Sequence, residues 1–191
     1  MKKIFAFLFM ISFCMVMNAQ NAVHFRLKAD GTFLSEDNKD FVILEYKGKS
    51  AEELYTLVKS NVLKTYKSPK DVLSENQPTN LNVRALSEEF YSGYRLPGGF
   101  VSYSIFYNLV FHFKEGRIKV DAPLLDQYLN IEATALPGSK TFKSYVDDWF
   151  DKKGEPKAKK IKDIELIENL FNSLINNLLD EKTNNESEEN W

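Results

Sequence analysis

The chain of 191 residues has a single cysteine, Cys14, and it lies close to the N-terminus. We expect that segment to be removed as a leader, for reasons given below. The remaining chain then has no disulfide, no thiol nucleophile and no cysteine ligand for a metal. Its stability must come from a hydrophobic core, and the length is sufficient to build one.

Histidine is almost as scarce, with His24 and His112 as the two examples. The sequence has no HExxH pair, no GxSxG segment and no glycine-rich phosphate loop. A zinc site would need carboxylates to join two histidines that are far apart in the sequence. We therefore assign no catalytic residue, no metal and no cofactor. The motifs leave enzymatic activity open but favour a protein that is not an enzyme.

A strong charge of either sign is also missing. The formal net charge is −2, from 25 basic and 27 acidic residues, which argues against general nucleic-acid binding. Five lysines lie in one connector, residues 153–162, and a solvated linker explains them better than a site for anionic lipid.

The longest apolar run, residues 4–17, is too short to span a membrane comfortably. Lys2 and Lys3 precede this run, and the small residue Ala19 follows it, which is the order of a secretory signal peptide. We predict cleavage after Ala19, export to the periplasm or cell envelope, and no transmembrane span afterwards. Phe13 stands where a lipoprotein signal would need a small residue before the cysteine, which argues against lipidation.

Aromatic residues make up 14% of the chain, and the segment 100–113 is rich in them. Its odd positions from Val101 to Phe113 are all apolar or aromatic, while the even positions are mixed, which predicts a long strand with one buried face. Glu115 and Gly116 then form a two-residue hairpin loop. This loop would pair Phe113 with Ile118 and carry the apolar face across the turn.

The other elements follow from shorter patterns. Ser50 and Glu53 form a capping box that starts a helix, and this helix stops before Ser68-Pro69. Strands are predicted at residues 23–27, 41–46, 81–85 and 123–136, a loop at 91–99, and helices at 141–152 and 161–179. We divide the chain into a signal peptide (1–19), an α+β domain (20–153), a C-terminal helix packed on it (154–180) and a disordered acidic tail (181–191).

Three of these features resemble an exported bacterial domain of unknown function whose fold is like that of the TATA-binding protein. They are the leader ending in Asn18-Ala19-Gln20, the segment Tyr66-Lys67-Ser68-Pro69-Lys70-Asp71-Val72 after the first helix, and the aromatic strand pair within 107–120. The resemblance covers residues 41–120 and includes no catalytic motif. It implies an antiparallel sheet of β-α-β-β-β-type order with helices on one face, and it implies no activity.

The candidate site residues are Tyr91, Tyr94, Arg95, Phe106, Asn108 and His112. The first three belong to a glycine-rich segment that could present an aromatic platform, and the last three lie on the mixed face of the long strand. We expect a non-enzymatic domain that uses one of these surfaces to bind an envelope protein or a small ligand. Two alternatives stay open: a hydrolase that uses carboxylates with His112, and a structural or assembly protein that acts through the helix 161–179.

Overall fold

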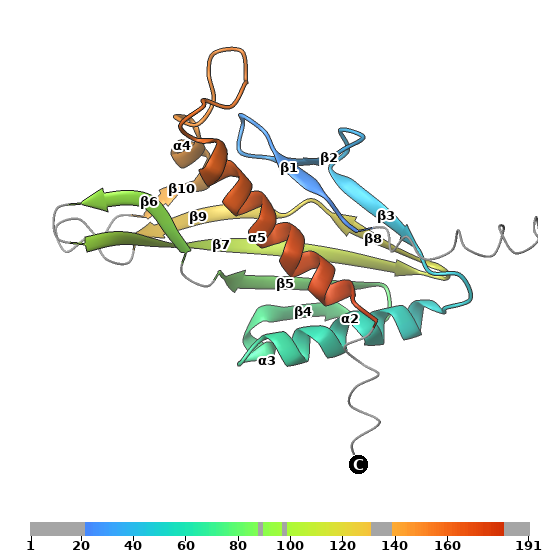
Figure 1. Cartoon of the computed structure of the whole chain (residues 1–191). Helices are drawn as coiled ribbons and strands as arrows, with labels where there is room; N and C mark the ends of the chain where they lie inside the picture. Colours follow the sequence, from blue (N-terminus) through green and yellow to red (C-terminus); the bar gives the residue numbers. More distant parts are fainter. Residues whose placement is uncertain (1–21, 88–89, 97–98, 131–138, 182–191) are drawn as a thin grey trace, which may run out of the picture.

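The computed structural model describes residues 22–87, 90–96, 99–130 and 139–181. Its strands are β1 (Phe25–Leu27), β2 (Phe33–Ser35), β3 (Phe41–Glu45), β4 (Leu73–Asn76), β5 (Asn80–Leu86), β6 (Phe90–Leu96), β7 (Gly99–Lys114), β8 (Arg117–Asp121), β9 (Leu124–Asn130) and β10 (Ser139–Thr141). Its helices are α2 (Ala51–Thr65), α3 (Pro69–Val72), α4 (Phe142–Val146) and α5 (Ile161–Leu179). Figure 1 shows α5 crossing in front of the long strand β7.

The strand β7 is the centre of an antiparallel sheet of eight strands. It is long enough to pair with two strands along each edge: β5 and β6 on one side, β8 and β9 on the other. The outer strands β4, β3 and β10 pair with β5, β8 and β9 in turn. The order β3, α2 and then consecutive strands agrees with the β-α-β-β-β-type order implied by the resemblance.

The predicted hairpin is confirmed in position and register. Phe113 pairs with Ile118 and Phe111 pairs with Val120, and Gly116 takes a φ of 71° in the turn. That left-handed conformation suits glycine, which has no Cβ to clash. The register brings four apolar side chains together on one face, and all four are buried.

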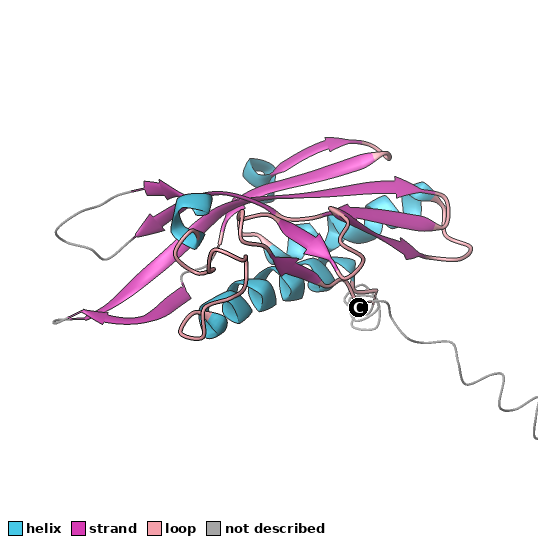
Figure 2. Cartoon of the chain, turned by 90° about the horizontal axis from the view of Figure 1, so that it is seen from above, coloured by secondary structure: helices cyan, strands magenta, loops and turns pink. Residues whose placement is uncertain are grey.

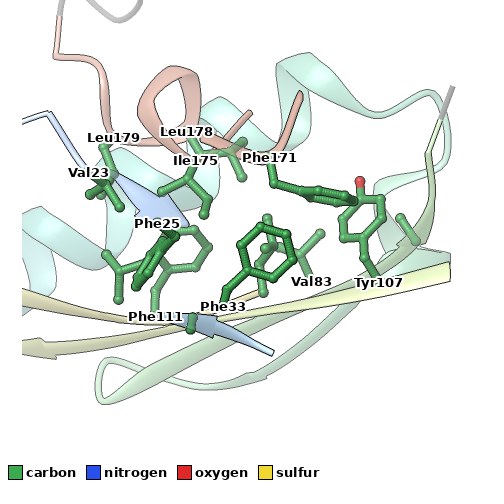
Figure 3. Packing of buried hydrophobic residues seen from close by; sticks show 14 of the residues in the cluster. Val23, Phe25, Phe33, Val83, Tyr107, Phe111, Phe171, Ile175, Leu178 and Leu179 are labelled. Carbon is green, nitrogen blue, oxygen red and sulfur yellow. The ribbon is translucent and has the colours of Figure 1, made fainter. Parts of the chain in front are cut away.

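The core lies between this face of the sheet and the two long helices. Figure 2 shows α2 and α5 on the same side of the long strands. Ile105, Leu109 and Phe111 of β7 are fully buried, and Phe33 and Phe25 of the small β1–β2 sheet fill the space below α5 (Figure 3). The predicted α+β class, with an antiparallel sheet and a C-terminal helix, is confirmed. None of the described helices is long and apolar enough to cross a membrane.

The first helix begins as predicted, because the Ser50 hydroxyl accepts from the Glu53 N–H and the Glu53 carboxylate accepts from the Ser50 N–H. On α5, Ile164, Ile167 and Phe171 are buried as the apolar stripe requires, while Leu174 is only half-buried.

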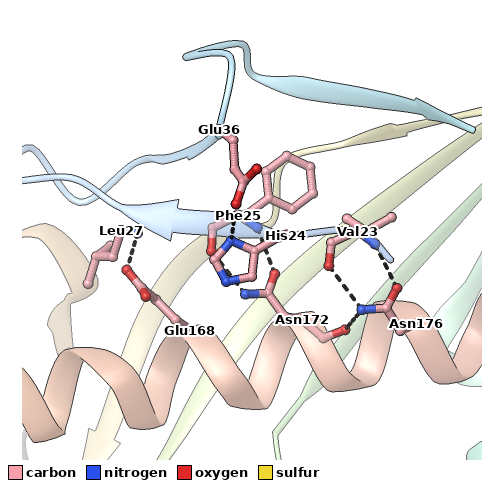
Figure 4. Close-up of polar contacts among 8 residues, drawn as sticks. All are labelled: Val23, His24, Phe25, Leu27, Glu36, Glu168, Asn172 and Asn176. Carbon is pink, nitrogen blue, oxygen red and sulfur yellow. Dashed lines mark hydrogen bonds and ion pairs between the residues drawn. The ribbon is translucent and has the colours of Figure 1, made fainter. Parts of the chain in front are cut away.

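The outer edge of β1 is held by side chains of α5 instead of by another strand (Figure 4). The Asn172 amide donates to the Phe25 carbonyl and accepts from the Phe25 N–H, both at 2.9 Å. Asn176 makes the same pair of bonds with Val23, and the Glu168 carboxylate accepts from the Leu27 N–H. Four residues along a helix rise ~6 Å and two residues along a strand rise ~6.6 Å. Side chains four apart on α5 can therefore bond to backbone groups two apart on β1. We call Glu168, Asn172 and Asn176 the polar clamp.

Two predicted elements are wrong. The segment 91–99 was predicted as a loop, but it contains β6, whose Leu96 pairs with Gly99 of β7. The glycines of this segment suggest a loop, but Gly93 lies within the strand at an irregularity, where the pairing shifts register between Tyr91 and Arg95.

The helix predicted at 141–152 ends at Val146. The buried aromatics Trp149 and Phe150 follow it. Trp149 lies in a turn in which its N–H donates to the Val146 carbonyl, and Phe150 forms a β-bridge with Pro156. Phe142, Val146, Trp149 and Phe150 have helical spacing in the sequence because all four side chains are buried in the core, although the last two lie outside the helix. The final part of the predicted strand 123–136 and most of the acidic tail lie outside the described residues.

Candidate functional site

The face of the sheet opposite the helices is the candidate site. The alternation of β7 that buries Tyr107, Leu109 and Phe111 leaves Phe106, Asn108, Val110 and His112 half-buried on the other side. The strand β5 extends this surface, because Leu86 pairs with Phe106, Arg84 with Asn108, Asn82 with Val110, and Asn80 with His112. We call this surface the open face.

One end of the open face is apolar. Leu124 of β9 is 63% exposed and pairs with Asn108, while Leu86 is 43% exposed and pairs with Phe106. Directly opposed side chains of neighbouring strands are in reach of each other. Leu86, Phe106 and Leu124 therefore gather around Asn108 as an apolar patch, which we call the leucine patch.

The surroundings of the leucine patch are polar. Arg84 Nη2 lies 3.8 Å from Asp126 Oδ2. Both side chains are well exposed, so this ion pair contributes little stability. The oxygens Asn82 Oδ1 and Asn108 Oδ1 are buried without a hydrogen-bond partner in the described part of the chain. Because both oxygens are buried, a partner on the open face does not reach them as these side chains lie.

The other end carries a cluster of charged groups. His112 Nε2 lies 2.8 Å from Asp121 Oδ2, and Lys119 Nζ lies 2.7 Å from Asp121 Oδ1. Burial acts to raise the pKa of Asp121, but hydrogen bonds from Lys119 and His112 outweigh it and hold that pKa below its usual value. Lys119 also stacks over the ring of Phe41, 4.8 Å from its centroid.

This cluster is limited in what it can do chemically. A histidine held by a carboxylate can act as a general base, but it needs a nucleophile or a positioned water to act on. Within the described ranges, no three histidine, cysteine or carboxylate side chains gather in a way that would hold a metal ion. His24 precedes β1, and its Nδ1 lies 3.7 Å from Glu36 Oε1, whereas His112 contacts Asp121. The hydrolase alternative therefore comes down to the pair His112 and Asp121.

The structure brings three of the six candidate residues together. Phe106, Asn108 and His112 share the open face, as their alternation predicts. Tyr91, Tyr94 and Arg95 lie in β6, which pairs with the first part of β7, and their side chains lie outside what the structure describes.

Several residues of the open face were not singled out from the sequence. Asn82, Arg84 and Leu86 alternate with the core positions of β5, so that strand did carry a signal. Leu124 and Lys119 join the surface only through the register of β9 and β8 with β7, which is a long-range property.

The comparisons with known proteins support the fold and indicate no function. No protein-family model matches the chain, and no curated protein matches it. A DUF4468 family protein from Bacteroides ovatus, solved by crystallography, is similar over 78% of this chain and 82% of its own, with a TM-score of 0.52 and 11% identity. A TBP-like protein from Parabacteroides distasonis is similar over 72% of this chain and 85% of its own, with a TM-score of 0.49 and 15% identity.

The likeness to the DUF4468 protein supports the fold of this chain. The DUF4468 protein is a member of a domain family of unknown function, which is the kind of protein that the sequence resemblance named. At these identities the likeness extends to the fold alone.

Proposed function

We propose that this chain is an exported cell-envelope protein that binds a partner protein on its open face and catalyses no reaction. The observation that carries the proposal is the leucine patch, exposed at Leu86 and Leu124 and bordered by the exposed charges of Arg84 and Asp126. An apolar centre with a polar surround is the usual composition of a protein–protein interface. Contiguous exposed apolar surface on a folded domain commonly marks a contact site.

The chemistry of the open face defines the partner. The leucine patch suits an apolar or aromatic side chain that would lie across Leu86, Phe106 and Leu124. The exposed side chains of Arg84 and Asp126 suit polar groups at the rim of a partner, which an apolar small molecule lacks. A protein segment supplies both, and the order of charges, apolar run and small residue at the N-terminus supports an encounter outside the cytoplasm.

The assembly alternative has less support. Helix α5 directs Ile164, Ile167, Phe171, Ile175 and Leu178 into the core of its own domain. Of its large apolar residues, Ile161 and Leu166 remain exposed, at 43% and 40%. That leaves too little apolar surface on α5 for a second helix to pack along it.

Site-specific photocrosslinking in the native host tests the proposal. A photoreactive residue at Leu124 should give one discrete protein adduct in the envelope fraction. The same residue at Leu63, which is 50% exposed on α2, is the matched control and should give none. Leu86→Arg in the Leu124-labelled chain should abolish the adduct while the melting temperature stays unchanged. Equal labelling from both positions, or an adduct that survives Leu86→Arg, would refute binding at the open face.

A further inference from the structure

The strand β3 is an edge of the sheet with apolar residues at its centre. Among the described residues β3 pairs with β8 alone, so its other edge has no partner strand (Figure 1). Natural edge strands are usually protected by a lysine, a proline or a bulge within the strand. β3 reads Phe-Val-Ile-Leu-Glu, and Ile43 at its centre is 46% exposed.

The backbone groups that face outward can be assigned from the bonds at either end of β3. The Ala122 N–H donates to the Asp40 carbonyl, and the Tyr46 N–H donates to the Gly116 carbonyl, so the even-numbered residues face β8. Because hydrogen-bonding direction alternates along an antiparallel strand, Phe41, Ile43 and Glu45 direct their N–H and C=O groups away from it.

The free edge has a defined length. At Lys39 the outward groups are already used, since its N–H donates to Ser35 Oγ and its carbonyl accepts from the Ser35 N–H. At the other end the Lys49 N–H donates to the Tyr46 carbonyl, which turns the chain. Three residues with six outward backbone groups therefore form the free edge.

We infer that two copies of this chain join through β3, antiparallel and centred on Ile43, to form one continuous sheet. This register pairs Ile43 with its symmetry mate and Phe41 with the partner subunit's Glu45. Each residue with unpaired outward backbone groups therefore lies opposite another such residue. A shift of two residues either way would require Lys39, whose groups Ser35 occupies, or Lys47, which lies in the turn. A two-fold contact of this kind closes on itself and does not propagate into a fibre.

Charge complementarity supports a second copy as the occupant. The ring of Phe41 lies under two ammonium groups, Lys119 at 4.8 Å and Lys39 at 5.8 Å from its centroid. Lys119 also pairs with Asp121, whereas no ion pair of Lys39 is found within the described residues. The register places the exposed carboxylate of the partner's Glu45 opposite Phe41, and therefore near Lys39, whose ammonium lies over the Phe41 ring. Because the dimer has two-fold symmetry, this contact occurs twice. Opposed charges across a strand pair stabilise it and like charges weaken it.

Sedimentation equilibrium of the full chain tests the inference, with the expectation of a reversible monomer–dimer equilibrium. Glu45→Lys and Lys39→Glu should each weaken the dimer by about tenfold or more, because each places like charges across the interface. The double variant Lys39→Glu/Glu45→Lys should recover most of that loss. Glu165→Lys on the exposed side of α5 is the matched charge reversal and should leave the equilibrium unchanged. A monomeric wild type at every soluble concentration would overturn the inference, as would a dimer that ignores both single reversals.

Two further variants test the register. Ile43→Pro removes an outward donor without touching a bond to β8, so the chain should be monomeric with an unchanged circular dichroism spectrum. Ile43→Cys, with Cys14 replaced by serine, should form a disulfide dimer on mild oxidation. Directly paired Cα atoms lie ~5.5 Å apart in such a ladder, within the range a disulfide spans. Leu63→Cys is the control, and crosslinking that is no faster at position 43 than at position 63 would exclude this register. If Ile43→Pro does not fold, the charge reversals decide the question alone.

Discussion

Removal of the Asn172 side chain should be one of the most costly single substitutions at a polar position of this protein. Asn172 is 7% exposed, and its amide makes two bonds of 2.9 Å to the backbone of Phe25, which is itself fully buried. Asn172→Ala leaves that N–H and that carbonyl without partners. Each stranded buried group costs about 1–3 kcal/mol, so we expect a loss of about 2–5 kcal/mol after the better helix propensity of alanine is counted.

Urea denaturation measures this loss, provided that the slopes of the variant and the wild type agree. Asn169→Ala, an exposed position on the same helix, is the matched control and should change the free energy of unfolding by less than about 0.5 kcal/mol. Asn176→Ala, at a half-buried position of the polar clamp, should fall between the two. A loss below about 1 kcal/mol for Asn172→Ala would mean that water reaches the edge of β1, and the reasoning behind the clamp would be wrong.

Three other predictions concern the sheet and the leader. Phe111→Ala should destabilise the protein by about 3–5 kcal/mol, because its ring is fully buried, whereas Phe106→Ala on the open face should cost less than half of that; equal losses in urea would show that both faces are covered. The lowered pKa of Asp121 means that its bonds to His112 and Lys119 contribute stability above its ordinary pKa of 3.8, and that this contribution is lost as the pH falls through the folded-state pKa. Thermal melts of wild type and Asp121→Asn should therefore differ at pH 6 and converge toward pH 2, and a difference independent of pH would contradict this account. Protein recovered from the envelope fraction should have the intact mass of a chain that begins at Gln20, and a mass that retains Met1 would exclude cleavage.

Patterns of sufficient length made the main elements predictable. The alternation in β7 extends over more than ten residues, and a slip of one position would have placed Lys119 opposite Phe113, so both the strand and its register could be predicted. The helices α2 and α5 span at least four turns each, which is enough for their apolar faces to be recognised. In contrast, β2, β4 and β10 have three or four residues each, too few to establish a period.

The candidate site was only partly accessible from the sequence. Phe106, Asn108 and His112 follow from the alternation of a single strand. The leucine patch requires Leu86 and Leu124, which come from two strands on opposite sides of β7, and no local pattern states which strands will be neighbours. The polar clamp is less accessible still, because an asparagine on the surface of an amphipathic helix looks solvated until the edge of β1 is placed against it.

The polar clamp also links the order of synthesis to the order of folding. Phe25 is among the first residues of the domain to leave the ribosome, and its partner Asn172 emerges 147 positions later. Until then the backbone edge of β1 has no acceptor or donor, and Phe25 and Phe33 have no helix above them. Contacts between such distant segments slow the search for the native state. The layer formed by β1 and β2 therefore cannot be completed until the last helix has been made.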